Sequence, residues 1–248
     1  MSPRLPRIPA ALAVLAALAT MHGVAPASTS PAPVTLPYSP KVDPANFVAR
    51  VDNRWFPLAP GTVLRYRGFA ENGRTPQSDV ARVTHRTKRI LGVDCTVVRD
   101  TVSSRGRPIE RTDDWYAQDK QGNVWYFGED ARNFEHGRFV KAGDSWESGA
   151  HGAQPGIIME AAPKRGDTYR QEYYRGHAED QARVLGGGGA VRVPAARFRH
   201  TLRTVERSRL EPGARELKFY AAGVGEVKSR VIRGDHERFA LVSVTRPR

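Results

Sequence analysis

Cysteine is almost absent from this sequence of 248 residues, since Cys95 is the only one. A single cysteine excludes an internal disulfide, so the chain must fold without covalent cross-links. With no cysteine near the start of the chain, we expect no lipid attachment there. Cys95 lies in a run typical of a strand, residues 92–98, and we interpret it as a small buried hydrophobic residue rather than a nucleophile.

Long hydrophobic runs are also missing. The longest, residues 8–19, is shorter than the about 20 residues that a transmembrane helix needs. It follows Arg4 and Arg7 and precedes Ala25-Pro26-Ala27, a pattern typical of a secretory signal peptide cleaved before Ser28. An uncleaved membrane anchor is the alternative. We expect a secreted or periplasmic protein that is soluble after cleavage and has no transmembrane segment in its mature chain.

The predicted signal peptide, residues 1–27, is followed by a proline-rich stretch that we interpret as an extended linker, residues 28–46. The remaining residues, 47–248, are enough for one domain with a sizeable core.

Acidic residues are too few to balance the basic ones: 26 Asp and Glu stand against 39 Lys and Arg, a formal net charge of +13. Such a bias favours attraction to polyanions, and anionic polymers of the cell envelope are the candidates for an exported protein. A solvated surface without a partner is the alternative. We expect no nucleic-acid partner, because no nucleic-acid-binding motif is present.

Long amphipathic helices are missing too. Short runs rich in Val, Thr, Tyr and Trp are separated by Gly, Pro, Asn and Asp, a pattern typical of an antiparallel meander. In residues 62–69, Arg65 and Arg67 alternate with Leu64 and Tyr66, so the two pairs face opposite sides of a strand.

About a dozen such strands must curl or close to cover their edges. We therefore predict a mostly β fold: a curved antiparallel sheet or open half-barrel with a cupped interior and little helix. A flat two-sheet sandwich is the alternative. The glycine-rich residues 142–166 are predicted to be a long loop, and residues 186–189 a flexible turn.

Two clusters of acidic and aromatic residues are candidate sites. In the first, Trp125 and Phe127 share one face of a predicted strand and accompany Asp114, Glu129 and Asp130. Aromatic platforms beside carboxylates suit a sugar or another planar ligand. The alternative is a half-buried hairpin whose aromatic residues only pack.

The second cluster contains Glu172, Tyr173, His177, Glu179 and Asp180. On a strand, His177 and Glu179 would face the same side, where they could act as an acid/base pair or hold a metal. Two ligands are too few for zinc, so no metal site is assigned and the cofactor stays unknown. The side chains that could complete such a site are His136, His151, Glu160 and Glu172. A surface salt-bridge network with Arg170, Arg175 and Arg183 is the alternative.

Four segments together resemble a family of exported bacterial proteins, some of them lipoproteins, that has no assigned function. They are residues 52–61 (DNRWFPLAPG), 114–130 (DWYAQD to GNVWYFGED), 155–180 (PGI, then GDTYRQEYY to HAED) and 218–228 (KFYAAGVGEVK). The last segment is also similar to the closing strands of lipoprotein-carrier-like half-barrels. The resemblance implies export and a cupped β fold. Membrane tethering is not carried over, because the lipoprotein cysteine is missing.

Three functions stay open. The first is a binding module for a lipid, a glycan or an envelope fragment, lined by Asp114, Trp125, Phe127, Tyr173 and Asp180. The second is a hydrolase or lyase that pairs Glu129 or Asp130 with Glu172 or Glu179, assisted by His177. The third is a structural envelope protein. Templates for serine hydrolases and zinc proteases lack support, because neither Gly-x-Ser-x-Gly nor His-Glu-x-x-His occurs.

Overall fold

The computed structural model describes residues 38–247. The expected signal peptide, its cleavage site and the first part of the predicted linker lie outside the described residues. Between residues 38 and 247, no helix is long and apolar enough to cross a membrane.

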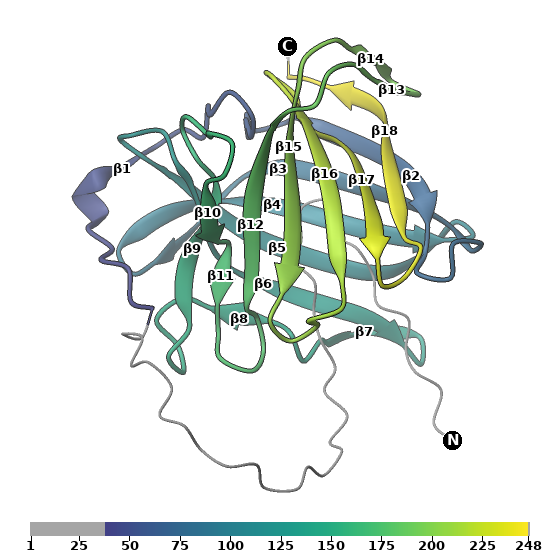
Figure 1. Cartoon of the computed structure of the whole chain (residues 1–248). Coiled ribbons are helices and arrows are strands. Elements are labelled where there is room, and N and C mark those ends of the chain that lie inside the picture. Colours follow the sequence, from purple (N-terminus) through teal and green to yellow (C-terminus); the bar gives the residue numbers. More distant parts are fainter. Residues whose placement is uncertain (1–37, 248) are drawn as a thin grey trace, which may run out of the picture.

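The described chain forms an antiparallel sheet of sixteen strands that curls until its two edges almost meet (Figure 1). In sheet order, the strands of the continuous path are β10 (Thr168–Arg170), β12 (Asp180–Gly187), β15 (Thr201–Ser208), β16 (Arg215–Ala221), β17 (Gly225–Arg233), β18 (Arg238–Thr245), β2 (Val63–Phe69), β3 (Pro76–Ile90), β4 (Val93–Ser104), β5 (Arg107–Asp119), β6 (Val124–Glu135), β9 (Gln154–Met159) and β11 (Glu172–Tyr173). In Figure 1, strands β12 and β15 to β18 form a front layer, and β3 to β6 cross behind them. The predicted mostly β fold with a curved sheet is confirmed.

The remaining elements lie beside this path. Strand β1 (Phe47–Val48) pairs with β5, and β7 (Arg138–Lys141) and β8 (Trp146–Glu147) pair with β6. Strands β13 (Val191–Val193) and β14 (Ala196–Phe198) form a separate hairpin. A 3₁₀ turn, Pro44–Asn46, is the only helical turn of the described chain.

One short segment, residues 168–173, joins the two edges of the sheet, and we call this junction the seam of the barrel. Strand β10 pairs with β12 at one edge and β11 pairs with β9 at the other, and only Gln171 separates β10 from β11. The backbone N–H of Gln171 donates to the carbonyl oxygen of Asp180 at 2.9 Å. Gly156 in β9 lies so close that a Cβ atom there would be 2.3 Å from the carbonyl carbon of Gln171. Closure of the barrel therefore depends on a position that tolerates no side chain.

The two faces of the sheet carry separate apolar clusters. The inner cluster contains Tyr66, Val83, Tyr116 and Leu241, among others, and fills one end of the barrel. The outer cluster lies on β4, β5 and β6, where Phe47 packs edge-on against Phe127 with ring centroids 5.6 Å apart. Cys95 belongs to this outer cluster and is fully buried, and burial raises the pKa of its thiol. The interpretation of Cys95 as a buried hydrophobic residue is confirmed.

The segment at residues 51–58 covers the apolar end of the barrel. Asn53 ties it down: its Nδ2 donates to the carbonyl oxygens of Gly122 (2.8 Å) and Glu160 (3.1 Å). Phe56 then packs on Tyr116, with ring centroids 5.3 Å apart. The first part of the DNRWFPLAPG motif thus closes one end of the barrel.

Two predictions about loops are wrong. Residues 142–166 are not one long loop, because Ile157, Ile158 and Met159 belong to β9, which pairs with β6. Gly186 and Gly187 lie in β12 rather than in a turn, and they pair with β15. In both stretches glycine has a role within the sheet: it allows two backbone segments to approach closely at Gly156 and a shift of register at Gly186. From the sequence alone, the same glycines predict a loop.

Replacing Gly156 with alanine is expected to lower the free energy of unfolding by about 2–4 kcal/mol, because the new methyl group would collide with backbone that cannot withdraw without opening the seam. Denaturant unfolding measures this. The matched control is Gly143→Ala, where no atom lies within 4 Å of the added carbon. Equal stability of the two variants would contradict the account of the seam.

Candidate functional site

The interior of the barrel changes from apolar to acidic along its strands. On β3, successive inward positions are occupied by Val83, Ala81, Asp79 and Gln77, and all four side chains are buried. The apolar members lie near the end covered by residues 51–58, and the polar members lie toward the hairpin that joins β2 to β3. The barrel therefore has an apolar half and a polar half.

The polar half contains a group of carboxyl side chains that we call the acidic interior cluster. None of them is more than 5% exposed, and each comes from a different strand. The members are Asp79 (β3), Asp100 (β4), Asp114 (β5), Glu129 (β6), Glu172 (β11) and Asp180 (β12). Since neighbouring members act on one another electrostatically, they form one connected group.

Burial is the main cause that raises the pKa values in this cluster. Burial raises the pKa of Asp114 well above its usual range, and the charge of Asp100 raises it further. The Tyr126 hydroxyl, which donates to Oδ1 of Asp114 at 2.8 Å, only partly offsets this rise in pKa. Burial likewise raises the pKa of Glu129, with Asp114 and Glu172 adding to the rise. These carboxyl groups therefore hold protons at pH values where exposed ones are ionised.

Glu172 shows the same balance at the seam of the barrel. Burial and the neighbouring Asp180 raise the pKa of Glu172, while the backbone of Asp180 and the indole of Trp146 lower it by a smaller amount. Its position next to Gln171 means that the strand segment that closes the barrel also delivers a carboxyl group to the interior.

Tyrosine rings lie among these carboxyl groups. Tyr116 and Tyr126 are stacked, with ring centroids 4.9 Å apart, and Trp146 meets Tyr126 edge-on at 5.5 Å. The hydroxyl of Tyr66 donates to the carbonyl oxygen of Glu226 at 3.0 Å. Aromatic faces beside carboxyl groups offer both cation–π and hydrogen-bonding contacts.

A buried lysine occupies the opposite wall. Nζ of Lys218 lies 2.8 Å from Glu206 and 3.5 Å from Glu216. Burial alone would lower the pKa of Lys218, but the two carboxylates outweigh it and raise the pKa well above the usual range. The positive charge of Lys218 is therefore paired with Glu206 and Glu216, and not with the carboxyl groups of the acidic interior cluster.

Several buried polar atoms of the interior have no hydrogen-bond partner within residues 38–247. They include Oδ2 of Asp114, Oε1 of Gln77 and Oε1 of Glu226. Buried polar atoms in proteins are nearly always hydrogen-bonded. Ordered water is the usual partner of such atoms in protein interiors.

A pocket of about 460 Å³ lies at the polar end, where the hairpins of β2–β3 and β4–β5 meet the end of β6. Gln77 lines this pocket and is also the inward neighbour of Asp79 on β3. Ile109 and Phe134 supply apolar lining, and Glu71 adds a carboxyl group. The pocket thus borders the acidic half of the interior.

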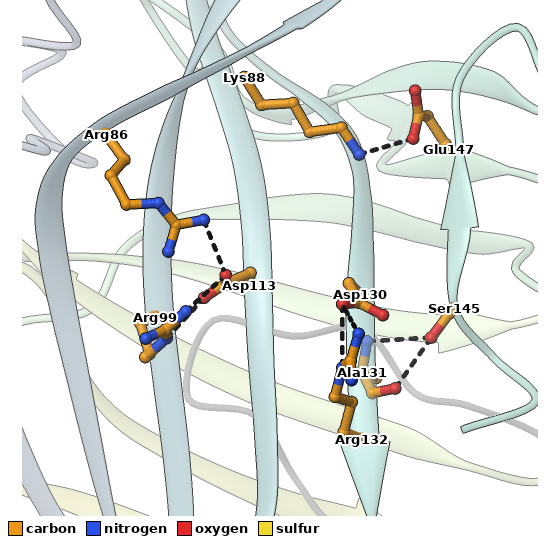
Figure 2. A network of polar contacts seen from close by, with 9 residues as sticks. All are labelled: Arg86, Lys88, Arg99, Asp113, Asp130, Ala131, Arg132, Ser145 and Glu147. Atoms are coloured by element: carbon orange, nitrogen blue, oxygen red, sulfur yellow. Dashed lines mark hydrogen bonds and ion pairs between the residues drawn. The ribbon is translucent and has the colours of Figure 1, made fainter. Parts of the chain in front are cut away.

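A second hollow, of about 540 Å³, lies on the outer face of β5 and β6. Glu129 and Asp130 both line it, together with Trp146 and His151. Figure 2 shows that four cations in and beside this hollow contact acids: Arg86 and Arg99 reach Asp113, Arg132 reaches Asp130, and Lys88 reaches Glu147. Lys141 also lines the hollow. This part of the outer face therefore mixes cations with carboxylates.

The structure brings together four of the residues predicted from the sequence: Asp114, Glu129, Glu172 and Asp180. It separates the others from them. Trp125 and Phe127 do share one face, but this is the outer face, where Phe47 covers them. Asp130 also faces outward and binds Arg132. Tyr173 packs against Tyr38, with ring centroids 5.7 Å apart.

His177 and Glu179 do not lie on a strand, so the prediction that they share a strand face is wrong. Strand β12 begins only at Asp180, because residues 174–178 form a tight turn closed by hydrogen bonds between Tyr174 and Ala178. The ring of His177 stacks on Tyr174 at 4.2 Å, and Glu179 pairs with Arg209 at 3.6 Å.

The sequence analysis missed Asp79, Asp100, Glu206, Lys218 and Glu226. What identifies these five residues is their position along a strand. Each occupies an inward-facing position, and the outward-facing positions beside it hold basic, apolar or polar residues. Extending the alternation seen in residues 62–69 along every strand would have pointed to them. Among the described residues, no group of three or more His, Cys, Asp or Glu side chains is arranged to hold a metal ion.

Comparisons with known proteins add two likenesses of fold. One solved structure, from Bacteroides fragilis, is named "putative exported protein with YmcC-like fold"; it is 14% identical, matches 78% of this chain and 100% of its own, and has a TM-score of 0.40. Another, a "putative lipoprotein" from Parabacteroides distasonis, is 11% identical over the same shares, with a TM-score of 0.43. No family model and no curated protein matches the chain. Its function must be argued from its own residues, which define an acid-lined β-barrel.

The raised pKa values predict that the protein is more stable in mild acid than in mild base. The pKa of Glu110, at the edge of the cluster, rises to about 8 from 4.5 through burial and then the charge of Asp144. Between these two pH values the unfolded chain has released protons that the folded chain still holds, so stability falls as pH rises. Denaturant unfolding at pH 5 and pH 8 should show a loss of a few kcal/mol, since one pKa unit corresponds to about 1.4 kcal/mol.

The variant Glu129→Gln serves as the internal control, because it removes a carboxyl group whose pKa burial raises. Its stability should depend less on pH than that of the unchanged protein. Stability that is constant or rises from pH 5 to pH 8 would contradict the assignment of protonated interior carboxyl groups.

Proposed function

We propose that this protein is exported and binds a small cationic ligand, one that carries an amine or guanidinium group, in the acidic half of the barrel. The proposal of export rests on the signal-peptide pattern of residues 1–27. The lipids, glycans and envelope fragments considered from the sequence are thereby narrowed to those that bear positive charge, because an acidic interior disfavours free fatty acids and other anions.

One observation carries the proposal. Within residues 38–247, no Lys, Arg or His side chain forms an ion pair with Asp100, Asp114, Glu129 or Glu172. Buried charges in proteins are paired or neutralised. Without a cation, protons would neutralise these groups, and a bound cation would replace the protons while Tyr116 and Tyr126 supply aromatic faces.

The position and the volume of the pocket at the polar end also fit a small cationic ligand. The pocket of about 460 Å³ borders the cluster at Gln77. Its volume falls within the about 300–1,000 Å³ that small-molecule sites usually have. A ligand that enters there with its charged group first would meet Asp79 and Asp100 next, and its apolar part could remain against Ile109 and Phe134.

Binding of a cation should therefore release protons. Titration calorimetry at pH 7 with spermidine, choline and arginine, in two buffers of different ionisation enthalpy, measures both affinity and proton release. We expect at least one of the three to bind with release of about one proton or more. The variant Asp114→Asn should weaken binding at least tenfold.

The matched control is Asp94→Asn, which removes an exposed carboxylate that pairs only with Arg89 on the surface. It should bind as the unchanged protein does. If none of the three cations binds, or if both variants bind alike, the proposed site is wrong.

A second candidate function is hydrolysis at the outer hollow. It is favoured by the fact that Glu129, whose pKa is raised by burial, lines that hollow beside Asp130. A carboxylic acid whose pKa is raised can serve as the general acid of a hydrolysis. A screen with nitrophenyl esters and glycosides tests this. Turnover that falls about 10²–10⁴-fold in Glu129→Gln would support it, and no turnover on any substrate would leave binding as the function.

A further inference from the structure

The outer face of the front layer carries basic side chains without acidic ones. We define the basic outer face by the outward positions of six adjacent strands: β12, β15, β16, β17, β18 and β2 (Figure 1). Its cations are Arg65, Arg67, Arg183, Arg203, Arg207, Lys228, Arg230 and Arg238. All acidic residues of these six strands face the interior; they are Asp180, Glu206, Glu216 and Glu226.

These cations are not neutralised by the chain itself. Within residues 38–247, none of the eight forms an ion pair, whereas Arg86, Arg99 and Arg132 on the outer face of the back layer all do. Figure 2 shows the ion pairs of the back layer. In the described chain, the back layer also carries cations without an ion pair, such as Arg82 and Arg111, but there carboxylates share the outer surface, whereas the six strands of the basic outer face have none facing outward.

Register places some of these cations directly opposite one another. Arg230 faces Arg238 across the β17–β18 pair. Like charges at directly opposite positions destabilise a sheet. The back layer also has opposed arginines, Arg82 and Arg99, but there Asp113 pairs with Arg99, whereas no carboxylate pairs with Arg230 or Arg238 among the described residues. Departures from local stability are expected where function requires them.

The cations lie in rows that cross the strands. One row runs through Arg203, Phe219, Lys228, Ala240 and Arg67, which are successive cross-strand partners. Neighbouring strands are about 4.8 Å apart, so the cations of this row recur at about 10 Å along a line over the curved face. A line of repeated positive charge fits a partner with repeated negative charge along a chain.

A groove marks one end of the rows. It has a volume of about 590 Å³ and is lined by Arg165, Arg183 and Arg203 with no acidic side chain. Nε of Arg203 is buried and has no hydrogen-bond partner among the described residues. Arginine presents a planar set of donors that matches phosphate and carboxylate groups, and seven of the eight cations of the face are arginines.

We propose that the basic outer face binds a linear polyanion, whose chain crosses strands β12 to β2 and whose phosphate or carboxylate groups contact the arginine rows. This inference does not depend on the ligand of the interior. A flat membrane is a poorer fit, because the face is curved and only one of its strands carries an exposed large apolar side chain, Ile232 in β17. The other exposed large apolar residues of the described chain, Val48, Leu91 and Phe134, lie outside the six strands.

The test compares two triple variants that remove the same charge. Lys228→Gln/Arg230→Gln/Arg238→Gln changes the basic outer face, and Arg86→Gln/Arg89→Gln/Arg132→Gln changes the compensated back layer. Binding of labelled inorganic polyphosphate, poly-glutamate and vesicles of anionic lipid is measured over a range of salt concentrations. Polyphosphate and poly-glutamate distinguish phosphate from carboxylate as the preferred group.

We expect at least one of the two polymers to bind, with an affinity that falls steeply with salt. The front-layer variant should weaken binding at least tenfold and reduce the slope of log K against log[salt] by about 2, since three contacts are lost at about 0.7 each. The back-layer variant should lose less than threefold. The denaturation midpoint of the front-layer variant should be equal or higher, because repulsion between Arg230 and Arg238 is relieved, so weaker binding would not reflect unfolding.

Three results would overturn the proposal: neither polymer binds, both variants weaken binding equally, or the vesicles bind while neither polymer does. Equal weakening would mean that net charge alone causes attraction. Binding only to vesicles would mean that the face contacts a membrane.

Discussion

Successive side chains of a strand face opposite sides of its sheet, and a sheet that curls on itself has only one inside. In this protein that constraint sorts the ionisable groups. On β15, for example, Glu206 faces the interior while Arg207 faces solvent. A shift of one residue in register would bury arginines and expose carboxyl groups, so the same alternation that specifies the fold also specifies the charge of each surface.

Closure of the barrel converts this sorting into chemistry. Because residues 168–173 pair with both edges of the sheet, the interior carboxyl groups are withdrawn from solvent, and burial becomes the main cause of their raised pKa values. An open sheet with the same residues would leave them hydrated and ionised. The seam at Gly156 and Gln171 is therefore what keeps these carboxyl groups out of solvent.

The sequence predicted the class of fold well and the site only partly. Alternation in residues 62–69 and the spacing of turns were enough to infer a curved antiparallel sheet, because both are local signals. The position of His177 could not be inferred, because a tight turn at residues 174–178 replaces the expected strand. The inner or outer direction of Trp125 depends on which face Phe47 covers, and that contact joins residues far apart in the chain.

The central claim is that burial raises the pKa of the interior carboxyl groups well above the usual range. The most direct measurement is a carbon-13 NMR titration of the Asp and Glu carboxyl resonances, with Asp114→Asn and Glu129→Gln used for assignment. The account predicts that the resonances of Asp114 and Glu129 titrate well above the usual carboxyl range, because burial raises the pKa of both groups. Titration of both groups within the usual carboxyl range would contradict it.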